Sequence, residues 1–150
     1  MKAERGAAAT THDQHELLLG KATARIAQVR YAVTIEMGPH VLVADEPKSL
    51  GGQDAGPAPF SILAAALGAC TSATLKMYAE RKQWPLTSLK VALRYLRSPQ
   101  GVDRIERRLT IEGLNDEQCA KLADVAERTP VTLAIKGGVA IDTSLTSADS

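Results

Sequence analysis

The sequence predicts a domain of the α+β class, and three observations lead to this. Segments with strand-like alternation are grouped rather than alternating strictly with helical segments, which disfavours a parallel βαβ sheet. Residues 55–75 carry no charge and follow a stretch rich in Gly and Pro, which predicts one long internal helix. The length of 150 residues suits a single domain with a core of its own.

The N-terminal part predicts strands and a turn. Residues 29–37, "VRYAVTIEM", alternate apolar and polar side chains and predict a half-buried strand with Arg30 on its polar face. Gly38-Pro39 predicts a turn, the following "HVLVA" a second strand, and residues 17–27 an earlier one. We expect residues 1–15 to form a flexible tail and residues 16–145 to form the domain.

A loop and a long helix come next. Residues 45–59 are dense in Gly and Pro and predict a loop, and Pro59 suits a first helical turn. The helix is expected to run to about Lys82 and to be buried all round up to Leu75, because it is apolar on nearly every side. By length the uncharged run could cross a membrane, but its Gly, Pro, Ser and Thr residues favour a buried helix instead. One sheet and two helices could not cover that helix on every side, which predicts a homodimer.

The C-terminal half predicts a hairpin and a second helix. "TSLKVALRY" and "RIERRLTIEG" read as paired strands around the turn "SPQG", and Arg107 interrupts the apolar face of the second strand. "NDEQCAKLADVAER" predicts a helix in which Asn115 and Gln118 form a capping box. Pro130 follows the end of this helix, and a last strand is expected near "GGVAIDT".

Composition excludes several classes of function. Lys plus Arg number 18 and Asp plus Glu 17, so the charge gives no overall drive toward nucleic acid or an anionic membrane. Two cysteines make neither a secreted disulfide framework nor a zinc site, and the N-terminus lacks the apolar stretch of a signal peptide. A reducing, cytoplasmic location is the expectation. His12 and His15 lack a third ligand nearby, so neither a metal nor another cofactor is expected.

Cys70, in "LGACTSATLK", is the candidate nucleophile, although its local surroundings favour an inert thiol. Only a thiolate is an effective nucleophile. Cys70 lies about eleven residues into the predicted helix, beyond the single turn over which the helix dipole acts. Its helical neighbours are uncharged, so a cation must come from another element for catalysis. Arg107, on an apolar face, and Arg30, on a polar one, are the two candidates.

Several segments together resemble the OsmC/Ohr family of thiol peroxidases, over about residues 30–143. They are "DEP", "GGQDAGPAPF", "LAAALGACTSATLKMYAERKQWPL", "RIERRLTIEGLNDEQ" and "TPVTLAI". The resemblance implies an intertwined homodimer in which antiparallel sheets wrap around long central helices. It also implies that Cys70 attacks organic hydroperoxides in an apolar pocket at the dimer interface. The pocket residues expected here are Phe60, Leu67 and Thr74.

The sequence departs from the family pattern at two places. Thr129 stands where many members have a resolving cysteine, so an external thiol is expected to reduce the sulfenic acid. Cys119 lies ten residues earlier, about 15 Å along an α-helix, and the interpretation favoured for it is a small core residue. The family's usual glutamate falls on Phe60 or Ser61, and Glu46 is a candidate replacement.

Two questions stay open from the sequence. The resemblance favours Arg30 as the activating arginine, because the family's arginine generally comes from the N-terminal strands, whereas the break in the apolar pattern favours Arg107. The second question is catalysis itself. A non-catalytic protein that binds an apolar small molecule in the dimer pocket is the alternative to a peroxidase, and a stress-related interaction protein is a weaker one.

Overall fold

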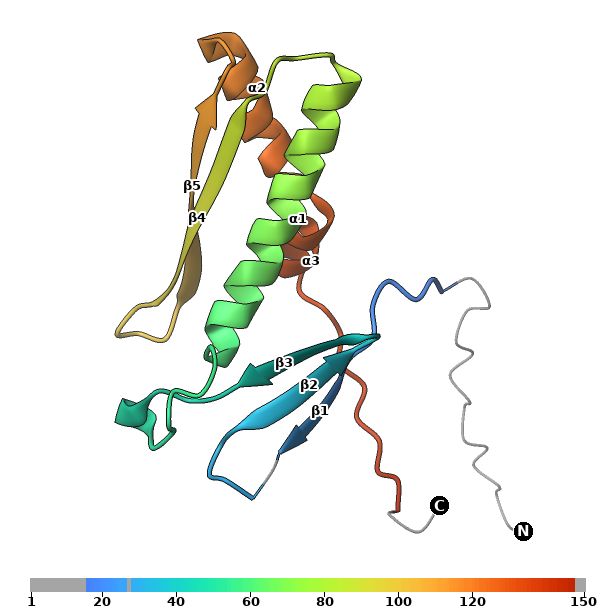
Figure 1. The fold of residues 1–150 in the computed structure, drawn as a ribbon, viewed down its shortest axis with the longest axis vertical. Coiled ribbons are helices and arrows are strands. Elements are labelled where there is room, and N and C mark those ends of the chain that lie inside the picture. Colours follow the sequence, from blue (N-terminus) through green and yellow to red (C-terminus); the bar gives the residue numbers. More distant parts are fainter. Residues whose placement is uncertain (1–15, 27, 148–150) are drawn as a thin grey trace, which may run out of the picture. The chain divides into compact units, whose positions relative to one another are not determined.

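The computed structural model describes residues 16–26 and 28–147, and its mixed helices and antiparallel sheets confirm the predicted α+β class (Figure 1). The chain forms two compact units, one up to Gly56 and one from Pro57 onward. The predicted tail, residues 1–15, lies outside the described residues, as do His12 and His15.

The N-terminal unit is an antiparallel meander of three strands. They are β1 (Thr23–Ile26), β2 (Val33–Met37) and β3 (His40–Ala44), with β2 in the middle. Ile35 lies opposite both Ala24 and Leu42. Apart from Val41 and Val43, which pair with polar residues of β2, the same register places the apolar side chains of the three strands on one face. That face holds Ala24, Ile26, Val33, Ile35, Met37, Leu42 and Ala44.

The prediction of a strand from residue 29 is wrong in its first part. β2 begins at Val33, and Arg30 lies in the turn that joins β1 to β2, with φ of 46°. Because Ile26 pairs with Val33, the residues between them must reverse the chain and cannot continue a strand. The left-handed backbone of Arg30 is uncommon for a residue other than glycine. The alternation at residues 29–31 therefore belonged to a turn.

The predicted loop after β3 is confirmed, and a buried carboxylate organises it. Asp45, only 3% exposed, accepts hydrogen bonds from the backbone N–H groups of Glu46 (2.8 Å), Gln53 (3.1 Å) and Ala55 (3.1 Å). The N–H of Ala55 is the main cause that lowers the pKa of the Asp45 carboxyl. A short 3-10 helix, η1 (Lys48–Leu50), lies inside the loop. A Cβ on Gly52 would overlap the carbonyl oxygen of Glu46, so this position requires glycine.

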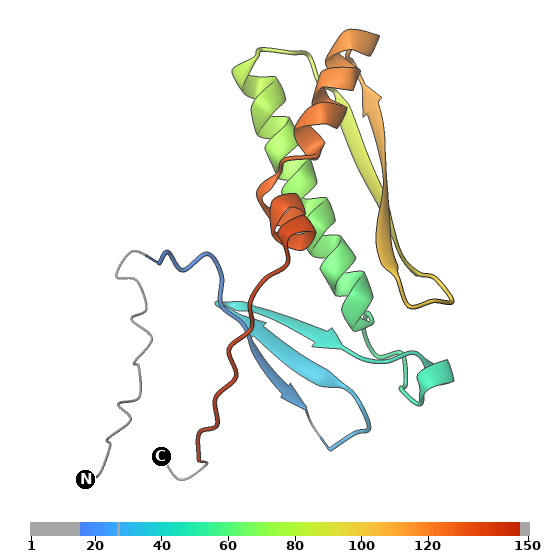
Figure 2. The same ribbon diagram turned by 180° about the vertical axis from the view of Figure 1, so that it is seen from behind.

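The C-terminal unit contains one long helix, a hairpin and two shorter helices. Helix α1 (Pro59–Arg81) runs along the hairpin of β4 (Ser88–Arg97) and β5 (Asp103–Glu112), as Figures 1 and 2 show. Helices α2 (Asp116–Ala126) and α3 (Pro130–Gly137) pack against α1 as well. The predicted bounds of α1, including Pro59 in its first turn, are confirmed.

The core of this unit lies between α1, α2 and the hairpin. Leu75, Leu122 and Ala126 are almost fully buried, and each leucine of this size stabilises the fold by roughly 1.5–3 kcal/mol. Partly buried side chains of α1, the hairpin and the connecting segments surround them, namely Tyr78, Trp84, Leu86, Leu89, Leu109, Ile111, Leu114 and Val125. The predicted capping box of α2 is present: the Gln118 N–H donates to Asn115 Oδ1 (2.9 Å) and the Asn115 N–H donates to Gln118 Oε1 (3.1 Å).

Within one chain helix α1 is buried on one side only, and its burial all round stays a prediction that depends on a second copy of the chain. Only Leu67, Gly68, Thr71, Leu75 and Ala79 are buried, all toward one side. α1 has the length and composition of a membrane span, yet only 22% of its most apolar window is buried in the chain. Within the C-terminal unit, the hairpin, α2 and α3 pack on one side of α1 and leave its other side uncovered.

The predicted last strand is also wrong, and a helix was missed before it. Residues 138–147 form neither helix nor strand, whereas residues from Pro130 to Gly137 form α3. Pro130 occupies the first turn of α3, where its fixed φ and missing N–H favour a helix start. In the sequence this proline indicates only the end of the preceding helix, because a proline is compatible with both positions.

Candidate active site around Cys70 and Arg107

Cys70 lies on the side of α1 that the chain itself leaves uncovered. We define the Cys70 face as Leu63, Ala66, Cys70, Ala73 and Met77, which follow one another at intervals of three or four residues. Cys70 is half-buried, whereas the other four side chains are exposed, Met77 by 58%. The thiol is therefore placed within an apolar stripe of small and flexible side chains.

The sulfur of Cys70 has no polar partner among residues 16–26 and 28–147. It is a free cysteine, and neither a hydrogen bond nor an ion pair joins it to a described side chain. Arg107, one of the two predicted activators, donates instead to the neighbouring residue, Thr71. In the described chain, therefore, no cation contacts the Cys70 sulfur that could stabilise its thiolate.

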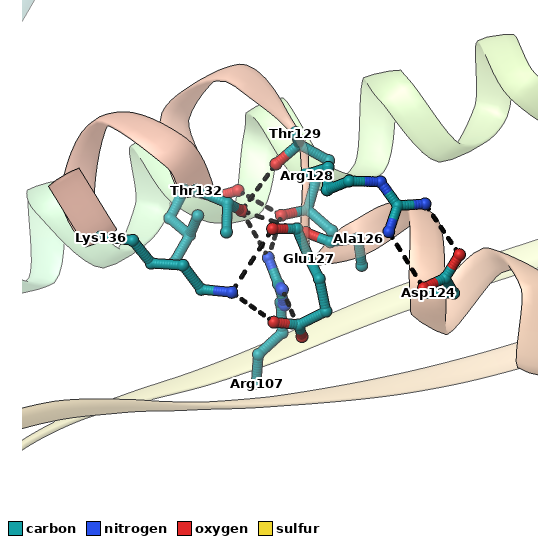
Figure 3. A network of polar contacts seen from close by, with 10 residues as sticks. Arg107, Asp124, Ala126, Glu127, Arg128, Thr129, Thr132 and Lys136 are labelled. Carbon is teal, nitrogen blue, oxygen red and sulfur yellow. Dashed lines mark hydrogen bonds and ion pairs between the residues drawn. The ribbon is translucent and has the colours of Figure 1, made fainter.

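Arg107 is the centre of a buried polar network that joins β5, α1 and α3 (Figure 3). Its side chain is 11% exposed and, as predicted, shares the inward face of β5 with Ile105 and Leu109. Nη1 donates to the hydroxyls of Thr71 (3.1 Å) and Thr132 (2.8 Å). The apolar pattern on β5 is thus interrupted by an arginine that finds its partners on other elements.

The hydrogen bonds of this network fix the direction of each hydroxyl. Thr71 donates to the carbonyl of Leu67 (2.7 Å), so its oxygen is left to accept from Arg107. Thr132 donates to the carbonyl of Ala126 (3.2 Å) and therefore accepts from Thr129 (2.7 Å) as well as from Arg107. Each buried hydroxyl has a partner, as buried polar groups require.

A carboxylate closes the network at the surface. Glu127 accepts from Arg107 Nη2 (3.2 Å) at Oε1 and from Lys136 Nζ (2.5 Å) at Oε2. Lys136 first, and Arg107 second, hold the pKa of Glu127 below its usual value. Two cations thus share one carboxylate.

Arg30 and Glu46, the other predicted site residues, belong to the N-terminal unit. Arg30 Nη1 donates to the carbonyl of Gly51 (3.2 Å), which ties the β1–β2 turn to the loop after β3. The Glu46 side chain is half-buried and forms no ion pair within the described part of the chain. The expected carboxylate–arginine pair is therefore not formed between these two residues.

The three predicted pocket residues do not share one cavity. Leu67 lines a cavity of about 440 Å³ beneath Arg107, and Phe60 lines another of about 370 Å³ together with Tyr95 and Leu93. Thr74 is half-buried, four residues after Cys70 on α1. Sequence reasoning missed Thr71, Thr132, Glu127 and Lys136, although the misplaced charge of Arg107 was the signal that pointed to buried partners.

The two remaining predicted positions lie near α2 and α3. Thr129, the residue expected at the resolving position, is fully buried next to Thr132. Cys119 is half-buried on α2, and its Sγ lies 3.9 Å from the carbonyl oxygen of Leu114. In the described ranges, no three His, Cys, Asp or Glu side chains are grouped to hold a metal ion.

Comparison with known proteins identifies the family. The model of the OsmC-like protein family matches residues 51–144, which include Cys70, Arg107 and Thr129. The chain belongs to the OsmC-like family. The comparison with curated proteins gives no match.

Solved structures confirm the predicted OsmC-like fold. An OsmC-like protein from Mycoplasma pneumoniae has 20% sequence identity and a TM-score of 0.69, covering 79% of this chain and 87% of that chain. The organic hydroperoxide resistance protein OsmC from Legionella pneumophila has 22% identity and a TM-score of 0.64, covering 81% and 92%. The organic hydroperoxide resistance protein OhrB of Bacillus subtilis has 21% identity and a TM-score of 0.58, covering 81% and 93%.

Proposed function

We propose that this OsmC-like protein is a thiol-dependent peroxidase that reduces organic hydroperoxides through Cys70. The observation that carries the proposal is the position of Cys70, a half-buried free thiol on the uncovered apolar side of α1, inside the segment that matches the family. Structural neighbours from Legionella pneumophila and Bacillus subtilis are named organic hydroperoxide resistance proteins, which supports the substrate class.

The proposed reaction needs one nucleophile and an external reductant. The Cys70 thiolate attacks the terminal oxygen of a hydroperoxide, a sulfur–oxygen bond forms, and the oxygen–oxygen bond breaks. The alkoxide that leaves takes up a proton and becomes an alcohol, and Cys70 becomes a sulfenic acid. An external thiol displaces water from the sulfenic acid to give a mixed disulfide, and a second thiol releases Cys70. A reducing cytoplasm would supply these thiols.

Thr129 explains why the reductant is expected to come from outside the chain. A hydroxyl cannot form a disulfide, and that of Thr129 is engaged with Thr132. Cys119 belongs to α2, where its sulfur faces the carbonyl of Leu114. We therefore assign neither residue a part in resolving the sulfenic acid.

Arg30 is the better candidate for the activating cation. Both Nη atoms of Arg107 donate to partners of its own network, whereas Arg30 has a single bond to the carbonyl of Gly51. Its left-handed backbone is the kind of strained conformation that concentrates at functional sites. In this proposal Arg30 approaches the thiol in the assembled dimer, and Arg107 supports the helix beside Cys70.

A second copy of the chain is the proposed cover of the Cys70 face. Exposed apolar patches of this kind mark interaction sites in water. A homodimer would bury Leu63, Ala66, Ala73 and Met77 and would exclude water from the thiol. The resulting apolar cleft suits a hydroperoxide with an alkyl or aromatic body, and Thr74, four residues after Cys70, is a proposed lining residue. Phe60 and Leu67, the other two expected lining residues, line cavities on the hairpin side of α1 instead.

The test is steady-state consumption of cumene hydroperoxide with dithiothreitol as reductant. We expect many turnovers per chain for the wild type and for Cys119→Ala, and only the uncatalysed rate for Cys70→Ala. Circular dichroism of each variant checks that the fold is retained. Turnover by Cys70→Ala at the wild-type rate would reject the proposal.

The alternative is a non-catalytic protein of the same fold that binds an apolar small molecule. The absence of a cation against Cys70 in the described chain favours it. It predicts no turnover by the wild type and an apolar molecule that co-purifies with the protein and is detected by mass spectrometry after extraction.

A further inference from the structure

We propose that the cavity between α1, β5 and α3 binds a small amphipathic carboxylate, independently of the chemistry at Cys70. The cavity measures about 440 Å³, within the range of small-molecule sites. Leu67, Ile105 and Ile135 form its apolar walls, and Arg107, Lys136 and Glu127 supply its charged groups. Cys70 is not among the lining residues, so this cavity and the thiol are separate features.

The charge at this cavity is unbalanced. Arg107 and Lys136 are both cationic, and the only carboxylate that contacts them in the described chain is Glu127 (Figure 3). The Arg107 side chain is 11% exposed, whereas that of Glu127 is 55% exposed. Because Glu127 carries one negative charge and pairs with two cations, the group keeps a net positive charge. A buried positive charge that no anion balances is costly.

Two N–H groups of Arg107 are not used in the hydrogen bonds of this network. A guanidinium carries one N–H at Nε and two at each Nη atom. Nη1 uses both of its hydrogens on Thr71 and Thr132, and Nη2 uses one on Glu127. The N–H at Nε and the second N–H at Nη2 have no partner among the described residues. They can donate to a carboxylate, the group whose geometry suits two guanidinium donors.

The walls define the rest of the ligand. Leu67 is 5% exposed and Ile135 36% exposed, so the cavity offers apolar surface from its interior to its mouth. A short aliphatic or aromatic chain can lie against these walls while its carboxylate faces Arg107 and Lys136. Glu127 is exposed enough to move aside, so the ligand carboxylate and Glu127 compete for the same two cations.

This competition can be tested, because a network with a purely structural role would not bind a carboxylate more tightly when Glu127 is neutralised. Octanoate is titrated into the full chain and binding is measured by calorimetry, with 1-octanol as the uncharged probe of equal chain length. Glu127→Gln removes the competing charge and is expected to tighten octanoate binding about 3- to 10-fold, within the range of one ordinary net hydrogen-bond contribution. Lys136→Gln is expected to weaken it by a similar factor.

Matched controls separate this site from the thiol and from general charge effects. Lys121, an exposed lysine of α2 that pairs with Asp124, is the control position, and Lys121→Gln should leave octanoate binding unchanged. Cys70→Ala should also leave it unchanged, whatever its effect on peroxidase activity. The proposal is overturned if octanoate does not bind, if 1-octanol binds equally well, or if Glu127→Gln fails to tighten binding.

Discussion

The two sides of helix α1 differ in how the chain completes them. We define the Thr71 face as Leu67, Thr71, Leu75 and Ala79, all of which are buried against other elements of the same unit. On the Cys70 face the apolar side chains around the thiol are exposed, and the sulfur has no polar partner in the described chain. One helix therefore has a side that is complete within its own unit and a side for which we propose a second copy of the chain as cover.

The difference shows how a fold can keep stability and reactivity apart. The Thr71 face gains its stability from Leu75 in the core and from the hydroxyls that Arg107 joins. The Cys70 face is mostly exposed and contributes little to the folding of one chain, and in the proposed function it forms the dimer interface and holds the reactive thiol. We therefore expect substitutions on the Thr71 face to lower the free energy of unfolding and substitutions on the Cys70 face to change the oligomeric state.

The largest effect is expected for Ala73→Glu on the Cys70 face. In the proposed dimer this carboxylate would be buried without a partner, which weakens association by about 100-fold or more. Sedimentation equilibrium should show monomers where the wild type is dimeric. Ala92→Glu, an exposed change opposite Arg108 on the hairpin, is the matched control and should stay dimeric. A dimeric Ala73→Glu protein would show that this face is not the interface.

Leu75→Ala tests the Thr71 face directly. Leu75 is fully buried, so the cavity left behind should lower the free energy of unfolding by about 2–5 kcal/mol, measured by urea denaturation. Val102→Ala, at a residue 65% exposed in the hairpin turn, should change it by no more than about 0.5 kcal/mol. Equal losses for the two variants would contradict the assignment of the core.

Thr132→Val tests the polar part of the same face. The valine keeps the volume but leaves an N–H of Arg107 and the hydroxyl of Thr129 without an acceptor. We expect a loss of about 1–3 kcal/mol in the free energy of unfolding. Thr110→Val, at an exposed position of β5, is the control. No loss at Thr132 would mean that water satisfies these groups.

The smallest effect is expected near the start of α1, where the ring of Phe60 lies against that of Tyr95 on β4, with 4.4 Å between the ring centroids. Asp103 accepts from Arg97 and from the Tyr95 hydroxyl (2.6 Å), and these bonds lower the pKa of Asp103 to about 2. Because this pKa lies below the unfolded value of about 4, the contacts stabilise the folded chain at neutral pH, and their contribution is lost as the pH falls from about 4 through about 2.

The Asp103→Asn variant measures this contribution. Its Tm should lie below that of the wild type at pH 7, and the gap should close as the pH approaches 2. A gap that stays constant over this pH range would show that the Asp103 carboxylate is not responsible for it.

Local sequence patterns predicted much of the C-terminal unit. The uncharged run with Pro59 at its start gave the bounds of α1, and Asn115 with Gln118 gave the cap of α2. Arg107 was predicted on an apolar strand face, and it is found there. These features depend on residues close in sequence or on a simple period of two.

The wrong predictions concern features that depend on contacts between residues far apart in the sequence, which local hydrophobic patterns do not reveal. The turn that holds Arg30 follows from the pairing of β1 with β2, and alternation alone could not reveal it. Pro130 both follows one helix and begins the next, so its position was compatible with two structures. The partners of Arg107 lie on α1, on α3 and at the residue that follows α2, and only the folded chain brings them together.

The most direct test of the account compares the two cysteines within one chain. The wild-type protein is treated with one equivalent of cumene hydroperoxide in the presence of dimedone, and each cysteine is followed by peptide mass spectrometry. We expect one dimedone adduct per chain, formed on Cys70 before any adduct is measurable on Cys119. Adducts that appear on both cysteines at the same rate would contradict the claim that the uncovered side of α1 carries an activated thiol.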